Sequence, residues 1–358
     1  MKILILYTYN KGYLSNFFFE LSQMLSQLGH SLVNYAFKSK NQKFTKDNVD
    51  VIITKKGSYT RNYLNIYKLI KKVRPDVVIS NFSYANPALL FGKLLGVDQN
   101  IVWFHSLDKQ MESTKLNIII KKKFLKLADQ LIANSYLTKQ ELNDIYAVSE
   151  HKIKTLPFWS NIADTESSTN ALNINKDSQT INIGCPGRMA KHKNQRIVIE
   201  ALQMLKLNKR TNFHMYFAGV GEEFDNLNRM TEEAQLQDHI TFNGHVSASN
   251  MIEYYKSMDV IILPSLHEAF GLVFIEAISL GVPVIVSSMF GALSFIDSNT
   301  EDLDQIIFDP KSSVDLKNKL ELYLDHNGIP SDFFKTLYQE NFNKTLIFED
   351  FLTILEKN

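Results

Sequence analysis

The chain has 358 residues, of which 45% are hydrophobic and 22% charged, so it is long enough for two domains with separate cores. Its net charge of +1 hides an asymmetry, because residues 1–165 carry +11 and the remainder −10. Either the two halves bind different partners, or the first half has a lysine-rich surface that binds no partner. The single Cys185 excludes a disulfide framework, and no run reaches the roughly 18 apolar residues of a membrane span. Met1–Tyr7 is too short an apolar run for a signal peptide, which predicts a cytoplasmic protein, at most peripheral on the inner face of the cell membrane.

Residues 1–160 alternate short β-branched runs with helical patterns, as βαβ units do. A helix predicted over 16–28 ends at Gly29, the residue type expected just past a helix end. We expect parallel strands at 2–7, 31–36, 51–54, 76–80, 100–104, 130–133 and 152–156.

After a stretch rich in Asn, Asp, Ser and Thr, which predicts a linker over 166–180, the alternation resumes. The last predicted helix, 342–356, has one broad apolar face. The pattern predicts an α/β fold of two Rossmann-like, doubly wound domains, 1–165 and 181–340, facing each other across a cleft. The second domain is expected to contain strands 181–185, 213–218, 240–242, 259–263, 282–287 and 305–308 and helices 194–205, 222–234, 249–257 and 271–280.

The segment Glu268–Glu276 lies where a predicted strand turns into a helix. Open α/β sheets bind ligands at the carboxyl edge of their strands. The helix that starts near Phe270 directs free backbone N–H groups at this edge, which favours an anion. Its two flanking carboxylates are acceptors for hydroxyl groups. These features together suit a sugar nucleotide.

A basic turn, Gly187 to Asn194, follows the first strand of the second half. Arg188 can bind two phosphate oxygens in a fork, and Lys193 adds a mobile charge. Together they can neutralise a diphosphate, so we expect neither a metal ion nor a cofactor. Taken alone, this turn is also compatible with a solvated basic loop.

Four motifs resemble, in the same order, the donor-binding domain of the family 4 retaining glycosyltransferases, which have the two-domain GT-B fold. The resemblance covers roughly residues 181–290. The motifs are Gly187-Arg188 with Lys193-Asn194, Phe217–Glu222, Ile240–His245, and Glu268–Glu276 followed by Gly281–Val284.

The resemblance implies a role for each matching residue. Arg188 and Lys193 would hold the diphosphate, while Glu276 would accept the ribose hydroxyls and Glu268 would contact the donor sugar. The remaining donor-site residues are implied at the phosphates or beside the base, and they are Gly187, Asn243, His245, Val246, Ala269, Phe270, Gly271 and Leu272.

The amino-terminal half resembles the family less closely. Relatives often carry paired glycines after the first strand, whereas this chain has Gly12 alone, which still permits a tight turn. His105 follows a predicted strand, and in relatives this histidine reaches the donor sugar; a lone histidine is otherwise an ordinary loop residue. The resemblance therefore adds His105 to Arg188, Lys193 and Glu268 as a catalytic set. It also implies that helix 342–356 returns to the amino-terminal domain.

These expectations combine into a retaining, metal-independent glycosyltransferase that moves a sugar from a nucleotide-diphosphate donor, UDP-sugar favoured, to a hydroxyl of a glycan or lipid-linked acceptor. The basic domain, 1–165, would bind the acceptor and the acidic domain, 181–340, the donor. The expected setting is cell-envelope polysaccharide synthesis, without a nucleic-acid partner. The alternative is a non-catalytic nucleotide- or sugar-binding relative that acts as a subunit. A dehydrogenase would need Gly-x-Gly-x-x-Gly after the first strand. A glycoside hydrolase would use the paired carboxylates but would not need Arg188 and Lys193.

Two further patterns each allow two interpretations. Lys115–Leu127 predicts a helix with apolar and basic residues, either docking on an anionic membrane surface or facing the core with extended lysines. Asp302-Leu303-Asp304 imitates a metal-binding Asp-x-Asp motif. Its place in a loop well after the donor element favours solvated carboxylates.

Overall fold

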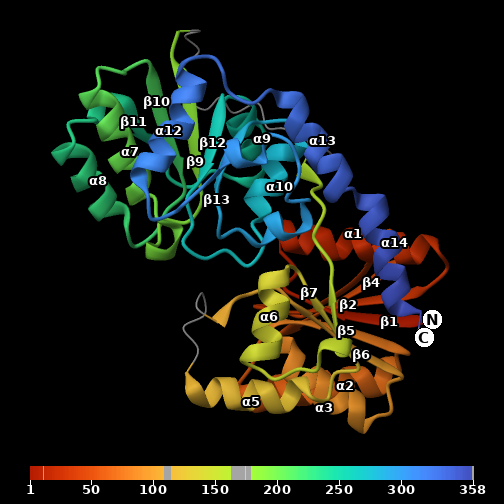
Figure 1. The fold of residues 1–358 in the computed structure, drawn as a ribbon. Helices are drawn as coiled ribbons and strands as arrows, with labels where there is room; N and C mark the ends of the chain where they lie inside the picture. Colours follow the sequence, from red (N-terminus) through yellow and green to blue (C-terminus); the bar gives the residue numbers. More distant parts are fainter. Residues whose placement is uncertain (11, 109–113, 163–173, 175–178, 357–358) are drawn as a thin grey trace. The chain divides into compact units, whose positions relative to one another are not determined.

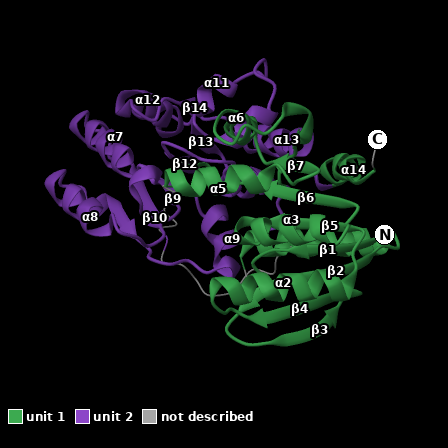
Figure 2. Ribbon diagram, turned by 90° about the horizontal axis from the view of Figure 1, so that it is seen from below, with its two compact units in different colours: residues 1–158, 345–358 green, residues 159–344 purple. Residues whose placement is uncertain are grey.

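The computed structural model describes residues 1–10, 12–108, 114–162, 174 and 179–356 (Figure 1). The chain forms two compact units (Figure 2). Unit 1 contains residues 1–158 and 345–358, and unit 2 contains residues 159–344. The linker predicted over 166–180 lies almost entirely outside the described residues.

Unit 1 is built on an eight-stranded sheet in the order β3-β4-β2-β1-β5-β6-β7-β8. Its strands pair in parallel except β3 with β4. The strands are β1 (Lys2–Leu6), β2 (Ser31–Lys38), β3 (Gln42–Lys46), β4 (Val49–Lys55), β5 (Val77–Asn81), β6 (Gln99–Phe104), β7 (Gln130–Ala133) and β8 (Ile153–Thr155). The helices are α1 (Tyr13–Gln27), α2 (Tyr59–Val73), α3 (Ala85–Leu94), α5 (Lys115–Leu125), α6 (Tyr136–Asp144) and α14 (Lys344–Leu355).

The final helix, α14, packs within unit 1, to which the chain returns after unit 2 (Figure 2). The ring of Phe351 stacks on Trp103 at 5.6 Å between centroids. The Gln99 side-chain amide donates to the Ile354 carbonyl at 3.0 Å. These contacts fix the apolar face of α14 on the sheet strand that ends next to His105.

Unit 2 contains a parallel six-stranded sheet in the order β11-β10-β9-β12-β13-β14. The strands are β9 (Ile181–Pro186), β10 (Phe213–Ala218), β11 (Ile240–Phe242), β12 (Val260–Leu263), β13 (Val284–Ser287) and β14 (Ile307–Phe308). The helices are α7 (Arg196–Leu207), α8 (Phe224–Glu233), α9 (Ala248–Lys256), α10 (Leu272–Ser279), α11 (Leu303–Ile306), α12 (Ser313–Leu324) and α13 (Ser331–Asn341). Two parallel-sheet α/β domains confirm the predicted fold class.

The order of strands in unit 2 locates its ligand site. β9 lies between β10 and β12, so the chain proceeds outward from β9 in one direction and then in the other. Such a switch point leaves a crevice at the carboxyl ends of the central strands. β12 and β13 are buried along their whole length, as expected of parallel strands covered on both faces.

The structure departs from the sequence-based expectations in one additional strand and one partly wrong strand. β3 was not predicted, because all five of its residues are exposed and show no apolar alternation. Asp47 and Asn48, with φ of 50° and 61°, turn the chain from β3 into β4, as expected of a tight hairpin. The predicted strand over 305–308 is wrong in its first half, which is helical in α11. Among the described residues, no helix is long and apolar enough to cross a membrane.

Candidate functional site

Two glycine-containing loops meet at the switch point of unit 2. A Cβ on Gly219, whose φ is 150°, would lie 1.9 Å from the carbonyl oxygen of Gly187. A Cβ on Gly221 would lie 2.2 Å from the carbonyl oxygen of Met189. Backbone hydrogen bonds from Gly187 to Ala218 (2.8 Å) and from Met189 to Val220 (3.1 Å) join the loops. Only glycine allows this approach, which brings the Arg188 loop beside the end of β10.

A cavity of about 590 Å³ lies over these loops. It brings together five of the predicted donor-site residues, namely Gly187, Arg188, His245, Val246 and Glu276. The rest of its lining consists of Pro186, Ala218, Gly219, Val220, Gly221, Met251, Tyr255 and Val273. A cavity of this size, with mostly apolar walls and a few polar groups, is typical of a small-molecule site.

Glu276 is held in this cavity by a residue that the sequence analysis missed. The buried Tyr255 of α9 donates its hydroxyl to Glu276 Oε2 at 2.7 Å. Burial raises the pKa of Glu276 to about 7, although the hydrogen bond from Tyr255 lowers it. The carboxylate is thereby oriented, and its two oxygens provide several acceptor positions for hydroxyl groups. The only sequence signal for Tyr255 was a pair of tyrosines in the helix before β12.

Nucleotide affinity is expected to depend on the ionisation of Glu276. Because the pKa of Glu276 is raised to about 7, the ionised form is lost as the pH falls below 7. Hydrogen bonds to a charged acceptor are about 1 kcal/mol stronger than those to a neutral one, so affinity should fall about fourfold between pH 8 and 6. Calorimetric titration with UDP at both pH values measures this change. Glu276→Gln should bind weakly with little pH dependence, whereas a wild-type affinity that is constant with pH contradicts the assignment.

Lys193 and Glu268 form an ion pair with Nζ and Oε2 2.5 Å apart, and their side chains are only 25% and 14% exposed. The Leu266 N–H donates to the His192 carbonyl at 2.8 Å, which joins the two loops that carry the pair. The backbone of Glu268 also forms an isolated parallel β-bridge with Phe290. Lysine has three donors, so Lys193 can keep Glu268 while it binds a phosphate oxygen. The predicted diphosphate cation and the predicted sugar-contacting carboxylate therefore touch each other.

Arg188 is held by its backbone, whereas its side chain is largely exposed. The Gln195 amide donates to the Arg188 carbonyl at 2.9 Å. The guanidinium lies 3.0 Å from Glu222, which is itself exposed. An exposed ion pair of this kind contributes little to stability, so Arg188 can exchange Glu222 for a phosphate at small cost.

The start of α10 is fixed by tight packing. Gly271 has a φ of 103°, and a Cβ there would lie 2.3 Å from the ring of Phe290. The Ala292 N–H donates to the Phe270 carbonyl at 2.8 Å, and Ala269 is buried beside it. The first N–H groups of a helix lack intrahelical partners, so the fixed turn from Ala269 to Leu272 offers them to an anion.

The predicted base-side turn is joined to the loop after β10. The Asn243 N–H donates to the Phe217 carbonyl at 2.8 Å, and the Gly219 N–H donates to the Gly244 carbonyl at 2.7 Å. The Asn243 side-chain nitrogen is buried and has no partner within the described part of the chain. This turn supplies the cavity with His245 and Val246.

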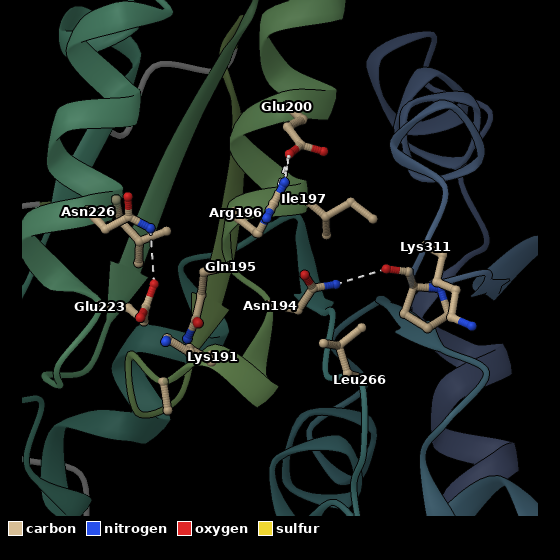
Figure 3. A pocket seen from close by; sticks show the side chains of 13 residues that line it. Lys191, Asn194, Gln195, Arg196, Ile197, Glu200, Glu223, Asn226, Leu266 and Lys311 are labelled. Atoms are coloured by element: carbon tan, nitrogen blue, oxygen red, sulfur yellow. Dashed lines mark hydrogen bonds and ion pairs between the residues drawn. The ribbon is translucent and has the colours of Figure 1, made fainter.

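A second cavity, of about 530 Å³, lies at the start of α7 (Figure 3). None of the predicted donor-site residues lines it. Two pairs of side chains in its lining are bonded to each other: Arg196 to Glu200 at 2.9 Å and Asn226 to Glu223 at 3.0 Å. Asn194 donates to the carbonyls of Pro264 and Pro310. The first cavity, and not this one, therefore brings predicted donor-site residues together.

Gly12 and His105 belong to unit 1, whereas the other predicted residues belong to unit 2. Gly12 precedes α1 and has a negative φ of −86°. Its N–H donates to Asn10 Oδ1 at 2.8 Å, and a Cβ would lie 2.9 Å from that oxygen. Close contact with Asn10 therefore favours glycine here, rather than a left-handed backbone.

His105 lies directly after β6, as predicted. Burial lowers the pKa of His105 to about 4, although a hydrogen bond to its own backbone opposes this and the charge of Lys121 adds to it. Its Nε2 is buried and has no partner among the residues described. A neutral imidazole with an unbonded ring nitrogen is suited to hydrogen bonding with a ligand.

Lys121 was missed as a neighbour of this histidine. Its ammonium lies 4.3 Å from the ring centroid of Phe104 and 5.1 Å from that of Tyr146. Burial lowers the pKa of Lys121 to about 8, against the opposing charges of Glu141 and Asp108. The sequence showed only a run of three lysines, of which one faces the interior.

Within the described ranges, no group of three or more His, Cys, Asp or Glu side chains could hold a metal ion. Asp302 precedes the short helix α11 and accepts a hydrogen bond from Gln305. Cys185 is buried, and burial raises the pKa of its thiol to about 12, as expected of a structural residue.

Similar proteins of known sequence span only parts of the chain. "Uncharacterized glycosyltransferase MJ1607" of Methanocaldococcus jannaschii is 30% identical over 174 residues, 47% of this chain and 44% of the relative. An "uncharacterized 41.2 kDa protein in cps region" of Klebsiella pneumoniae is 25% identical over 70% of this chain and 73% of its own length. The O-antigen chain mannosyltransferase B of Escherichia coli is 32% identical over 29% of this chain and 27% of the relative. The chain spans about half the length of the two Methanocaldococcus relatives, 44% and 57%.

Solved structures match the whole chain at low identity. Sucrose-phosphate synthase from Thermosynechococcus elongatus aligns with a TM-score of 0.78 and 18% identity over 99% of this chain and 98% of its own. Anabaena HepE in complex with UDP aligns with a TM-score of 0.80 and 16% identity over 99% of both chains. These likenesses establish the GT-B fold. Residues 14–159 match Glycosyltransferase Family 4 and residues 166–339 match Glycosyl transferases group 1, and the chain therefore belongs to the group 1 glycosyltransferases.

Proposed function

We propose that the protein transfers a sugar from a nucleotide-diphosphate donor to a hydroxyl group of a glycan or lipid-linked acceptor, with retention of the anomeric configuration. The observation that carries this proposal is the cavity at the switch point of unit 2, in which Arg188 and Glu276 share one lining. A guanidinium suits a diphosphate, and an oriented carboxylate suits ribose hydroxyls. Retention rests on the family resemblance.

UDP-sugars are the favoured donors. Anabaena HepE, which shares the fold, was solved with UDP and with UDP-glucose. The His245–Val246 edge of the cavity would lie against the base, while Arg188 would face the diphosphate. This orientation places the ribose at Glu276.

The proposed mechanism is electrostatic. As the bond between the anomeric carbon and the phosphate oxygen breaks, negative charge develops on the leaving diphosphate. Arg188, Lys193 and the N–H groups at the start of α10 would stabilise that charge. Arg188, Lys193 and the helix N-terminus would together supply the positive charge for the diphosphate, so the proposal includes no metal ion or other cofactor. Glu268 would hold a hydroxyl of the donor sugar, and His105 would stabilise the sugar as its bond breaks.

The proposed setting is cell-envelope polysaccharide synthesis in the cytoplasm. Two relatives support it by their names, the Klebsiella protein in the cps region and the Escherichia coli O-antigen mannosyltransferase. The acceptor would then be a growing glycan or its lipid-linked precursor.

Release of nucleotide from a sugar donor tests the activity. Wild-type protein is incubated in EDTA with UDP-glucose, UDP-galactose, UDP-N-acetylglucosamine or GDP-mannose, and free nucleotide is measured. We expect slow release from one donor, faster with a lipid extract as acceptor, and none from Arg188→Ala. Binding of nucleotide without release from any of these donors, with or without extract, would favour the non-catalytic subunit instead.

We also propose that α5 docks unit 1 on an anionic membrane surface. Ile118, Lys121 and Leu125 form the inward side of α5. Leu116 and Ile119 are 65% and 52% exposed, next to several exposed lysines. Exposed apolar residues flanked by lysines suit the interface of an anionic bilayer, where each cation contributes about 1 kcal/mol.

Flotation with phosphatidylglycerol vesicles tests the docking. We expect binding that falls with salt and drops about tenfold or more in Leu116→Gln/Ile119→Gln, because burying each side chain contributes about 1.5–3 kcal/mol. Leu207→Gln in unit 2 is the control, since Leu207 is 76% exposed but lies on α7. The absence of wild-type binding at low salt contradicts the proposal.

A further inference from the structure

Phe82 of unit 1 has an unusual backbone and an exposed ring. It follows Asn81, the last residue of β5, and has a φ of 47°. A non-glycine residue in the left-handed region costs about 1–3 kcal/mol and persists only when its surroundings impose it. The side chain is nevertheless 47% exposed, so burial of the ring does not offset that cost.

The neighbouring residues impose this conformation. Tyr84, two residues later, is buried. Its hydroxyl accepts the Phe37 N–H at 2.9 Å, and its ring stacks on that of Phe37 at 5.3 Å. On the other side, the buried Asn81 donates to the Leu6 carbonyl at 3.2 Å. The turn is thus anchored at both ends, while the side chain of Phe82 stays about half exposed.

The exposed ring borders the candidate catalytic histidine. The ring centroids of Phe82 and His105 are 4.0 Å apart in an edge-to-face arrangement. Both residues line a small cavity together with Trp103, Ser106 and Lys121. Its volume of about 20 Å³ accommodates one water molecule, so a larger ligand would lie over this group of residues rather than within the cavity.

Unsatisfied polar atoms surround the same cavity. His105 Nε2 and Trp103 Nε1 are buried and have no hydrogen-bond partner in the part of the chain that the structure describes. Buried polar groups are nearly always bonded, so each exception requires an explanation. The ring of His105, with its unbonded nitrogen, thus lies against the half-exposed ring of Phe82, a combination that suits a ligand with an apolar face and hydroxyl groups at its edge.

We propose that Phe82 is the platform for the acceptor's sugar ring. The C–H face of a pyranose would pack on the exposed face of Phe82, because aromatic faces carry partial negative charge. One hydroxyl of the same sugar would bond to the water molecule that the small cavity beside His105 accommodates. This inference rests on the proposed glycosyltransferase function and specifies its acceptor subsite in unit 1.

The test compares three variants. Phe82→Gly removes the ring and tolerates the positive φ, so it should be at least as stable as wild type. Phe82→Trp keeps an aromatic face. Arg74→Gly is the backbone control, because Arg74 has a φ of 49° at the end of α2, a different turn of the same unit. The probes are octyl glucoside, octyl galactoside, octyl mannoside and octyl N-acetylglucosaminide below their micelle concentrations, with UDP present.

Saturation-transfer-difference NMR measures binding and identifies the face of the sugar in contact. We expect at least one glycoside to bind wild type, Phe82→Trp and Arg74→Gly through its ring C–H protons, and Phe82→Gly to bind it at least tenfold more weakly. Equal binding by Phe82→Gly overturns the inference, as does wild type that binds none of the probes. UDP binding, measured in parallel, reports on the proposed function. If wild type does not bind UDP, the donor site is refuted. If wild type binds UDP and Phe82→Gly binds the glycoside as well as wild type does, only the platform is refuted.

Discussion

Lys193→Ala is expected to lower kcat/KM for sugar transfer by about 10²–10³-fold, or about 3–4 kcal/mol, which is typical for removal of one group that stabilises developing charge. The expected loss of stability is smaller, about 1–2 kcal/mol. That loss arises because Glu268, only 14% exposed, loses the hydrogen-bonding partner 2.5 Å away. The loss of transition-state stabilisation should therefore exceed the loss of folding stability.

Nucleotide release and thermal unfolding, measured on the same preparations, test this separation. Lys191→Ala is the matched control, because Lys191 is an exposed lysine in the same turn and lines the other cavity (Figure 3). It should retain nearly full activity and stability. A Lys193→Ala protein that loses rate only in proportion to its stability would show that Lys193 is structural.

Gly219→Ala is expected to destabilise the donor half severely, by about 4 kcal/mol. Its Cβ would lie 1.9 Å from the Gly187 carbonyl oxygen, and this backbone atom cannot move without shifting the Arg188 loop. The residue also has a φ of 150°. For a unit of this size the loss corresponds to a fall in Tm of about 8–16 °C, and nucleotide binding should weaken because the loops line the cavity.

Gly244→Ala separates packing from backbone strain. Gly244 has a φ of 62°, but a Cβ at this position would have no atom within 4 Å, so only the left-handed penalty of about 1–2 kcal/mol applies. Calorimetry on both variants should give a fall in Tm for Gly219→Ala that is at least twice the fall for Gly244→Ala. Similar losses would mean that the two loops can separate without cost.

Much of the fold could be predicted because parallel strands leave a strong signal. β7, β10 and β11 were predicted at their observed bounds, since continuous apolar runs between helical patterns are typical of a covered sheet. β3 could not be predicted, because its exposed residues carry no periodicity and its pairing depends on the turn at Asp47 and Asn48.

Site residues that follow the end of a strand could be predicted from the sequence. Their hydrogen-bond partners could not, where those partners come from another part of the chain. Arg188 and Glu276 could be named from their motifs, and the structure places both in one cavity. Tyr255 could not be identified as a partner of Glu276, because the hydrogen bond joins α9 to α10. The positive φ of Phe82 likewise has no sequence signal, since phenylalanine is not a residue expected in a left-handed turn.

Thermal unfolding with UDP, GDP and ADP in EDTA, on wild type and Arg188→Ala, tests most directly whether the cavity of unit 2 binds a nucleoside diphosphate without metal. A nucleotide at a hundred times its Kd adds about 2.7 kcal/mol, which raises Tm by about 5–10 °C for a unit of this size. The account predicts such a shift with one nucleotide, UDP favoured, and its loss in Arg188→Ala. No shift with any nucleotide, or a shift of equal size in the variant, would contradict it.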